Sequence, residues 1–137
     1  MPITRLLTTA SLCTTIATAA AADYTLTLQE TGMRSYYCTI TVSLTNTTDA
    51  PLTEVNGHFF SFLGDEQVGR SKGASFLNLA PGDSAEAVFE TPNAPCDDVT
   101  SYRFVIGACR IESSFIDKAE CAGLIDSTDP ISGAEGL

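Results

Sequence analysis

Four cysteines are the residues of this sequence best suited to form a covalent framework. Cys38, Cys96, Cys109 and Cys121 are separated by 58, 13 and 12 positions. A zinc site is the alternative, but these cysteines form no CxxC pair and have no histidine close by, and structural zinc sites usually contain such ligands. An even number of cysteines in a short exported chain favours disulfide bonds. The spacing therefore predicts two disulfides and no metal site.

His58 is the single histidine of the sequence, so a catalytic triad would have to use it. It alternates in register with Phe60 and Phe62, which predicts a half-buried histidine that is hydrogen-bonded for structure. The run Gly69-Arg70-Ser71-Lys72-Gly73 has G-x-S-x-G spacing, but His58 is the single histidine that could act as its base, so we do not expect a nucleophilic serine. Several serines are nevertheless available, among them Ser71, Ser75 and Ser84. We expect no catalytic residue and interpret the protein as a non-enzyme.

The other patterns that could do chemistry do not match known sites. Asp65-Glu66 and Asp97-Asp98 lack EF-hand spacing and are typical of solvated turns. Copper sites use clusters of methionine and histidine, whereas only Met33 and His58 lie beyond the first 22 residues. Neither G-x-x-x-x-G-K-[ST] nor G-x-G-x-x-G occurs, so nucleotide binding has no support. The sequence predicts no cofactor.

The first 22 residues have the order of a secretory signal peptide. Arg5 gives a positive start, a mildly apolar stretch follows, and small residues precede Asp23, so we expect cleavage near Ala22. A membrane anchor is the alternative, but threonines dilute the stretch and it is shorter than a span of about 20 apolar residues. Cys13 would leave with the leader. We expect a mature protein in the periplasm or outside the cell.

The acidic composition limits the possible partners. The sequence has 17 Asp and Glu against 7 Lys and Arg. Because Arg5 lies in the predicted leader, six basic residues remain and the net charge becomes −11. Nucleic acids and anionic membranes are bound through Lys and Arg. We therefore expect no nucleic-acid partner and no membrane insertion after cleavage.

Alternating apolar and polar residues predict short strands in the 115 residues that remain. Turn residues separate them; one turn contains Asn46-Thr47-Thr48, which matches an N-glycosylation pattern and is interpreted as turn chemistry. The sequence shows no convincing helical period. The pattern predicts a single antiparallel β-sandwich of six or seven strands. The expected strands cover residues 24–28, 38–44, 55–63, 68–79, 85–89 and 102–108.

The end of the chain has a weaker pattern. Residues 115–120 are compatible with either a last strand or one turn of helix, and the choice between strand and helix over 111–125 stays open. Residues 126–137 lack apolar periodicity, so we expect a flexible tail there. The sandwich is therefore expected to span residues 23–125.

The expected strand order suggests how the cysteines pair. In an immunoglobulin-like sandwich, the second and penultimate strands begin at the same end of opposite sheets. Cys38 begins the second strand and Cys96 precedes the strand opened by Tyr102. In that strand the core face would hold residues 102, 104, 106 and 108, which points Cys109 outward. We predict the pairs Cys38–Cys96 and Cys109–Cys121.

Two aromatic side chains are predicted to face solvent and form a candidate binding surface. Alternation places Cys38 in the core, so Tyr37 points outward. By the same argument Phe59 is opposed to Phe60 and Phe62 and also points outward. Such a pair could contact a protein or a sugar, or lie under the tail.

Several runs resemble FxLYD-type and related immunoglobulin-like modules of exported bacterial proteins. The resemblance rests on Val42–Leu52, Phe60–Asp65 and Leu79–Ala85 and covers about half of the mature chain. The sequence departs from it at Phe62-Leu63-Gly64-Asp65 and in its four cysteines. The resemblance implies a sandwich of adhesive or unassigned role and offers no catalytic residues.

The resulting expectation is an exported, non-catalytic binding or structural module of the bacterial envelope that contacts another envelope protein or a glycan. The alternative is a small exported enzyme or enzyme inhibitor that uses loops around Gly64–Gly73. A purely structural module that caps or spaces other envelope proteins is a third hypothesis. The sequence leaves the partner and the oligomeric state open.

Overall fold

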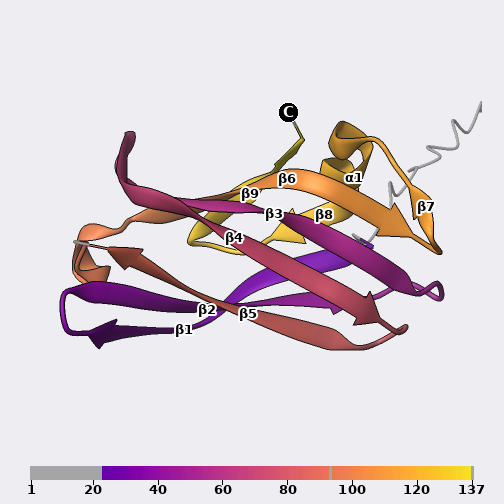
Figure 1. Cartoon of the computed structure of the whole chain (residues 1–137), viewed down its shortest axis with the longest axis horizontal. Helices are drawn as coiled ribbons and strands as arrows, with labels where there is room; N and C mark the ends of the chain where they lie inside the picture. The colour runs from indigo at the N-terminus through magenta and orange to yellow at the C-terminus, as the bar shows by residue number, and fades with distance from the viewer. Residues whose placement is uncertain (1–22, 93, 137) are drawn as a thin grey trace, which may run out of the picture.

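Two β-sheets packed face to face form the body of the protein (Figure 1). The computed structural model describes residues 23–92 and 94–136, so the predicted signal peptide and Cys13 lie outside the described residues. One sheet has the order β5-β2-β1-β8, and the other has the order β4-β3-β6-β7 with β9 also paired to β6. The predicted all-β sandwich is confirmed. The first sheet comprises β1 (Tyr24–Arg34), β2 (Tyr37–Asn46), β5 (Ser84–Pro92) and β8 (Ile125–Ser127), and the second β3 (Leu52–Leu63), β4 (Glu66–Leu79), β6 (Ser101–Ile111), β7 (Ser114–Phe115) and β9 (Ile131–Gly136).

The division of strands between the sheets follows the immunoglobulin-like pattern, with β1, β2 and β5 on one side and β3, β4 and β6 on the other. The pairs between these strands are antiparallel. The short strands β8 and β9 instead pair in parallel with β1 and β6. The sandwich is therefore antiparallel in its body and mixed where the end of the chain joins it.

Phe59 occupies the centre of the core, so the prediction that it faces solvent is wrong. It is 1% exposed, and its ring stacks between Phe89 (centroids 4.7 Å apart) and Phe104 (4.6 Å). The inward positions of β3 are Val55, Gly57, Phe59 and Ser61, all buried. A side chain at Gly57 would overlap the Phe104 ring, and the Ser61 hydroxyl is satisfied by Thr91 (2.9 Å). These contacts place the Phe59 face of β3 in the core, although the opposite face carries two phenylalanines, Phe60 and Phe62.

Asn46 shows why the turn after β2 contains a glycosylation pattern. Its side chain is buried; its Nδ2 donates to the carbonyl oxygens of Ala50 (2.9 Å) and Leu79 (3.1 Å). Its Oδ1 accepts from the backbone N–H of Thr48 (2.9 Å). Asn46 therefore joins the turns at this end of the sandwich, and its interpretation as turn chemistry is confirmed.

Both predicted disulfides are present, Cys38–Cys96 and Cys109–Cys121. The expected outward orientation of Cys109 is nevertheless wrong, because Cys109 is 1% exposed. The pairing of β3 with β6 shifts register beside Gly107, between Asn56 and Gly57. This bulge changes the alternation, so that Cys109 turns toward the core and bonds to the short helix α1 (Lys118–Leu124).

Residues 126–136 join the sandwich, which corrects the expected flexible tail over that part of 126–137 and extends the sandwich beyond residue 125. Asp117 caps α1 by accepting from the backbone N–H groups of Ala119 and Glu120. The open choice over 111–125 resolves into both structures, since β7 precedes α1. Ile125 and Ile131 are buried as β8 and β9 join the sheets. Within the described part of the chain, no helix is long and apolar enough to cross a membrane.

Candidate functional site

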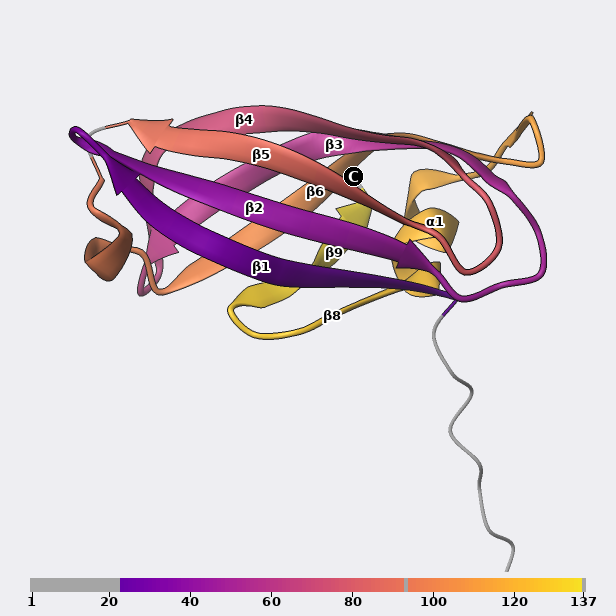
Figure 2. The ribbon, with the colours of Figure 1, turned by 90° about the horizontal axis from the view of Figure 1, so that it is seen from below.

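The hairpin between β1 and β2 projects beyond the core at one end of the sandwich (Figure 2). Every residue from Gln29 to Tyr37 is exposed, while Cys38 is fully buried. Arg34 pairs with Tyr37, so Ser35 and Tyr36 form a two-residue turn. Ser35 has φ 59°, the left-handed conformation that such hairpin turns require. The sequence thus forms a narrow protruding tip.

Three large apolar side chains are exposed at this tip. Tyr36 is 81% exposed, Met33 53% and Tyr37 38%. Tyr37 is therefore accessible, as predicted. Sequence reasoning missed Met33 and Tyr36, because a turn places consecutive side chains outside the alternation of a strand. We call Met33, Arg34, Ser35, Tyr36 and Tyr37 the hairpin tip.

The base of the hairpin tip is held by covalent and polar contacts. The Cys38–Cys96 disulfide joins β2 to the 3-10 turn η1 (Cys96–Asp98). The backbone N–H of Cys96 donates to Sδ of Met33 (3.3 Å). Arg34 lies 3.7 Å from the carboxylate of Glu90 on β5, an exposed pair that adds little stability. The disulfide and the β2–β5 ladder therefore present the tip on a fixed support.

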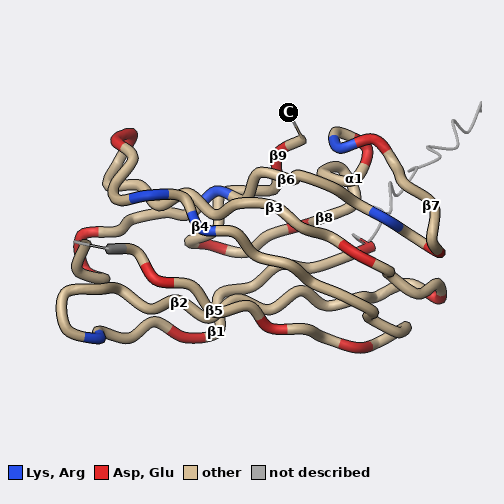
Figure 3. Tube along the Cα trace, viewed as in Figure 1, with Lys and Arg blue, Asp and Glu red and all other residues tan. Residues whose placement is uncertain are grey.

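Acidic residues border the hairpin tip. Glu30 precedes it on β1, and Asp97 and Asp98 lie in η1, which contacts both strands of the hairpin. Acidic residues are also spread along the rest of the molecule (Figure 3). The tip thus combines an apolar centre with a largely acidic border.

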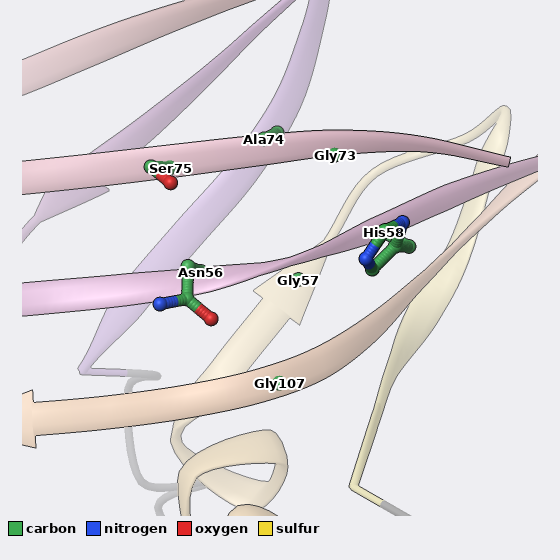
Figure 4. Close-up of a pocket in the computed structure, with 7 residues that line it drawn as sticks. All are labelled: Asn56, Gly57, His58, Gly73, Ala74, Ser75 and Gly107. Carbon is green, nitrogen blue, oxygen red and sulfur yellow. The ribbon is translucent and has the colours of Figure 1, made fainter.

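A second surface feature is a hollow on the outer face of β3, between β4 and β6 (Figure 4). It measures about 290 Å³ and is called here the glycine hollow. His58 is exposed and lines it, so the prediction of a half-buried histidine is wrong. β3 has the opposite face in the core from the one expected. His58 is therefore exposed and Phe59 is buried, the reverse of the prediction for each. The lining residues used below are Asn56, Gly57, His58, Gly73, Ser75 and Gly107.

A further hollow of about 310 Å³ involves the next two outward positions of β3, Phe60 and Phe62. The guanidinium of Arg103 lies 4.8 Å from the centre of the Phe62 ring. Its Nε is 3.2 Å from the carboxylate of Glu135 on β9. We call this the aromatic hollow; the sequence interpretation missed it because it assigned both phenylalanines to the core.

The described residues do not assemble a metal cluster. No group of three or more His, Cys, Asp or Glu side chains among them is arranged to hold a metal ion. Ser75 shares the glycine hollow with His58, whereas Ser84 is on β5, where its hydroxyl contacts Thr45 (2.7 Å). The region Gly64–Gly73, proposed as loops of an enzyme or inhibitor, is the β3–β4 turn followed by the first half of β4. It is therefore mostly strand.

Comparisons with known proteins identify a shared fold. No family model matches the chain, and no curated protein matches it. Among solved structures, IrmA from Escherichia coli superposes with a TM-score of 0.57 and 11% sequence identity, over 80% of this chain and 93% of that one. At this identity the similarity shows the fold alone. The two disulfides indicate an oxidising, non-cytoplasmic compartment.

Proposed function

We propose that this protein is an exported, non-catalytic binding module of the bacterial envelope whose hairpin tip contacts another envelope protein. One observation carries the proposal: Met33, Tyr36 and Tyr37 are exposed together at a projecting turn whose base is fixed by a disulfide. Exposed apolar groups gathered at one place are costly in water and mark contact sites.

The residue types at the tip suit a protein partner. Tyrosine and arginine dominate the energetics of many protein interfaces. Tyrosine also supplies a large contact area for two rotatable bonds, so little side-chain entropy is lost on binding. Tyr36 and Tyr37 would act as anchors, and the rigid base would reduce the ordering cost further.

The border of the tip indicates what the partner must offer. Glu30, Asp97 and Asp98 lie next to the apolar side chains. An interface with an apolar centre and charged rim gains specificity when the rims are complementary. The proposed partner therefore has an apolar pocket bordered by Lys or Arg.

Site-specific cross-linking in the native host tests this proposal. A photo-reactive phenylalanine analogue replaces Tyr36 in the full chain, and the same analogue replaces Val88 as a matched control. Val88 is also exposed, at 64%, but lies on β5 opposite Thr41, four residues along β2 from Tyr37. The expected result is a discrete adduct with one envelope protein from position 36 and none from position 88. The same adduct from both positions, or none from either, would contradict the proposal.

A further inference from the structure

Asn56 presents a fixed hydrogen-bond acceptor to the glycine hollow. Its Nδ2 donates to Oε1 of Glu54 (2.7 Å), and Glu54 lies 3.8 Å from Arg110. This leaves Oδ1 directed from β3 toward Gly107 on β6, where an added Cβ would lie 2.9 Å from it. The imidazole of His58 stands two residues further along the same face (Figure 4). An oriented amide oxygen and a ring that can donate or accept therefore border one space.

Gly73 and Gly107 keep this space open, and Gly73 is not required by a close contact. Gly107 is required, because an added Cβ would lie too close to Asn56 Oδ1. Gly73 is different, because an added Cβ would meet His58 Cε1 only at 3.8 Å and its φ is not in the left-handed region. A glycine inside a strand costs roughly 0.5–1 kcal/mol. Such a glycine often marks a place where a ligand approaches the backbone.

The aromatic hollow continues the same face. Asn56, His58, Phe60 and Phe62 are alternate residues of β3, and they extend over roughly 20 Å at about 3.3 Å per residue. Polar groups therefore line the glycine hollow, and phenyl rings line the aromatic hollow. Each hollow is near the lower end of the size range of small-ligand sites, which suits one ring of a ligand in each.

The charges at the two hollows favour a ligand without net charge. Arg103, which lines the aromatic hollow, is paired with Glu135, and Arg110 is paired with Glu54, the hydrogen-bond partner of Asn56. The chain as a whole is strongly acidic, which disfavours anions. The polar groups left for a ligand in the glycine hollow are the Asn56 carbonyl oxygen, the His58 imidazole and the Ser75 hydroxyl. The aromatic hollow adds the Gln67 side chain beside its phenyl rings. We propose that this face binds a neutral saccharide, with hydroxyls in the glycine hollow and an apolar sugar face on the aromatic hollow.

The single histidine makes the proposal testable by NMR. In the folded, oxidised protein, the imidazole resonances of His58 are followed during titration with three neutral trisaccharides: cellotriose, mannotriose and N-acetylated chitotriose. We expect at least one of them to shift these resonances saturably. Gly73→Val fills the hollow at a position with room for a side chain, and Asn56→Leu removes the acceptor. Both variants are expected to weaken binding by about tenfold or more.

The control is Leu77→Ala, which shortens an exposed side chain of β4 outside both hollows; its affinity should equal that of the parent. Amide spectra of each variant verify that the sandwich is intact. No saturable shift with any of the three sugars overturns the proposal. So does a shift that Gly73→Val and Asn56→Leu leave unchanged, because the sugar would then bind elsewhere. Neither result bears on the hairpin tip, which is a separate site.

Discussion

One disulfide lies beside an exposed hairpin, and the other lies beside a chain end that packs into the core. Cys38–Cys96 spans 58 positions and lies at the base of the hairpin tip, where Tyr36 and Met33 are exposed. Cys109–Cys121 spans 12 positions and attaches α1 to β6, next to a chain end that buries Ile125 and Ile131. The first bond therefore supports an exposed surface, and the second holds the chain end against the sandwich.

The difference shows what each bond adds to the non-covalent structure. β2 is already held by long ladders with β1 and β5, so the first bond reinforces strands that would pair without it. The helix α1 has seven residues, which is too short for a helix to persist by itself. The second bond, with the parallel pairs of β8 and β9, is what keeps this segment on the sandwich.

Removal of the first disulfide is the largest expected perturbation. Replacing Cys38 and Cys96 with alanine should lower the free energy of unfolding by about 4 kcal/mol, since a long loop is released in the unfolded chain. Urea unfolding of the oxidised parent and variant measures the loss. Hydrogen exchange should also rise at Gln29–Tyr37 and stay unchanged in α1. An equal increase in exchange at Gln29–Tyr37 and in α1 would contradict the distinction between the two disulfides.

Removal of the second disulfide should have a smaller and more local effect. Replacing Cys109 and Cys121 with alanine is expected to cost about 3 kcal/mol, because the released loop is shorter. Exchange should rise over α1, β8 and β9, while the hairpin tip keeps its parent rate. A variant whose chain end remains as protected as in the parent would show that the strand pairs alone hold it.

Tyr102 contacts both of these regions and gives a pH test. Its hydroxyl is 4.0 Å from Sγ of Cys38, and its backbone pairs with Ile131. Burial raises the pKa of Tyr102 from 10.0 to about 12. The unfolded phenol ionises first, so its contribution to stability is complete below pH 10 and is lost as the pH rises from about 10 to 12. Tyr102→Phe should show a shallower alkaline loss in urea unfolding; an unchanged slope would mean that this phenol does not contribute.

The smallest stability effect is expected at the hairpin tip. The triple variant Met33→Ser, Tyr36→Ser and Tyr37→Ser removes exposed side chains and the hydrogen bond from Cys96 N–H to Met33 Sδ, so its free energy of unfolding should fall by no more than about 1 kcal/mol. Thermal unfolding measures the difference. A loss above about 2 kcal/mol would show that these side chains serve the fold rather than a contact.

Much of the body of the fold could be predicted because its strands have a strict period of two. In β2, Cys38, Ile40, Val42 and Leu44 are all fully buried, as their alternation predicts. The same logic failed in β3, where Phe59 stacks between Phe89 and Phe104, and an added Cβ at Gly57 would meet the Val105 carbonyl oxygen and the Phe104 ring. No local pattern reveals these contacts between strands. Counting aromatic residues places Phe60 and Phe62 in the core, whereas the structure places them on the outward face of β3.

The chain end and the candidate sites were harder to predict for related reasons. β8 and β9 each bury a single large apolar residue, Ile125 and Ile131, too few to show a period. Tyr37 was found by alternation, but Tyr36 belongs to a turn; the tyrosine-, serine- and glycine-rich composition of residues 32–37 was the available signal. The glycine hollow is defined by missing side chains, which hydrophobic patterns do not register.

Native mass spectrometry of complexes from the host envelope tests the central claim most directly. The full chain, the triple tip variant and the control Val88→Ser are each purified from that fraction under non-reducing conditions. The account predicts one defined partner mass with the parent and with Val88→Ser, and a bare chain with the tip variant. Retention of the same partner by the folded tip variant would contradict the claim that the hairpin tip is the contact surface.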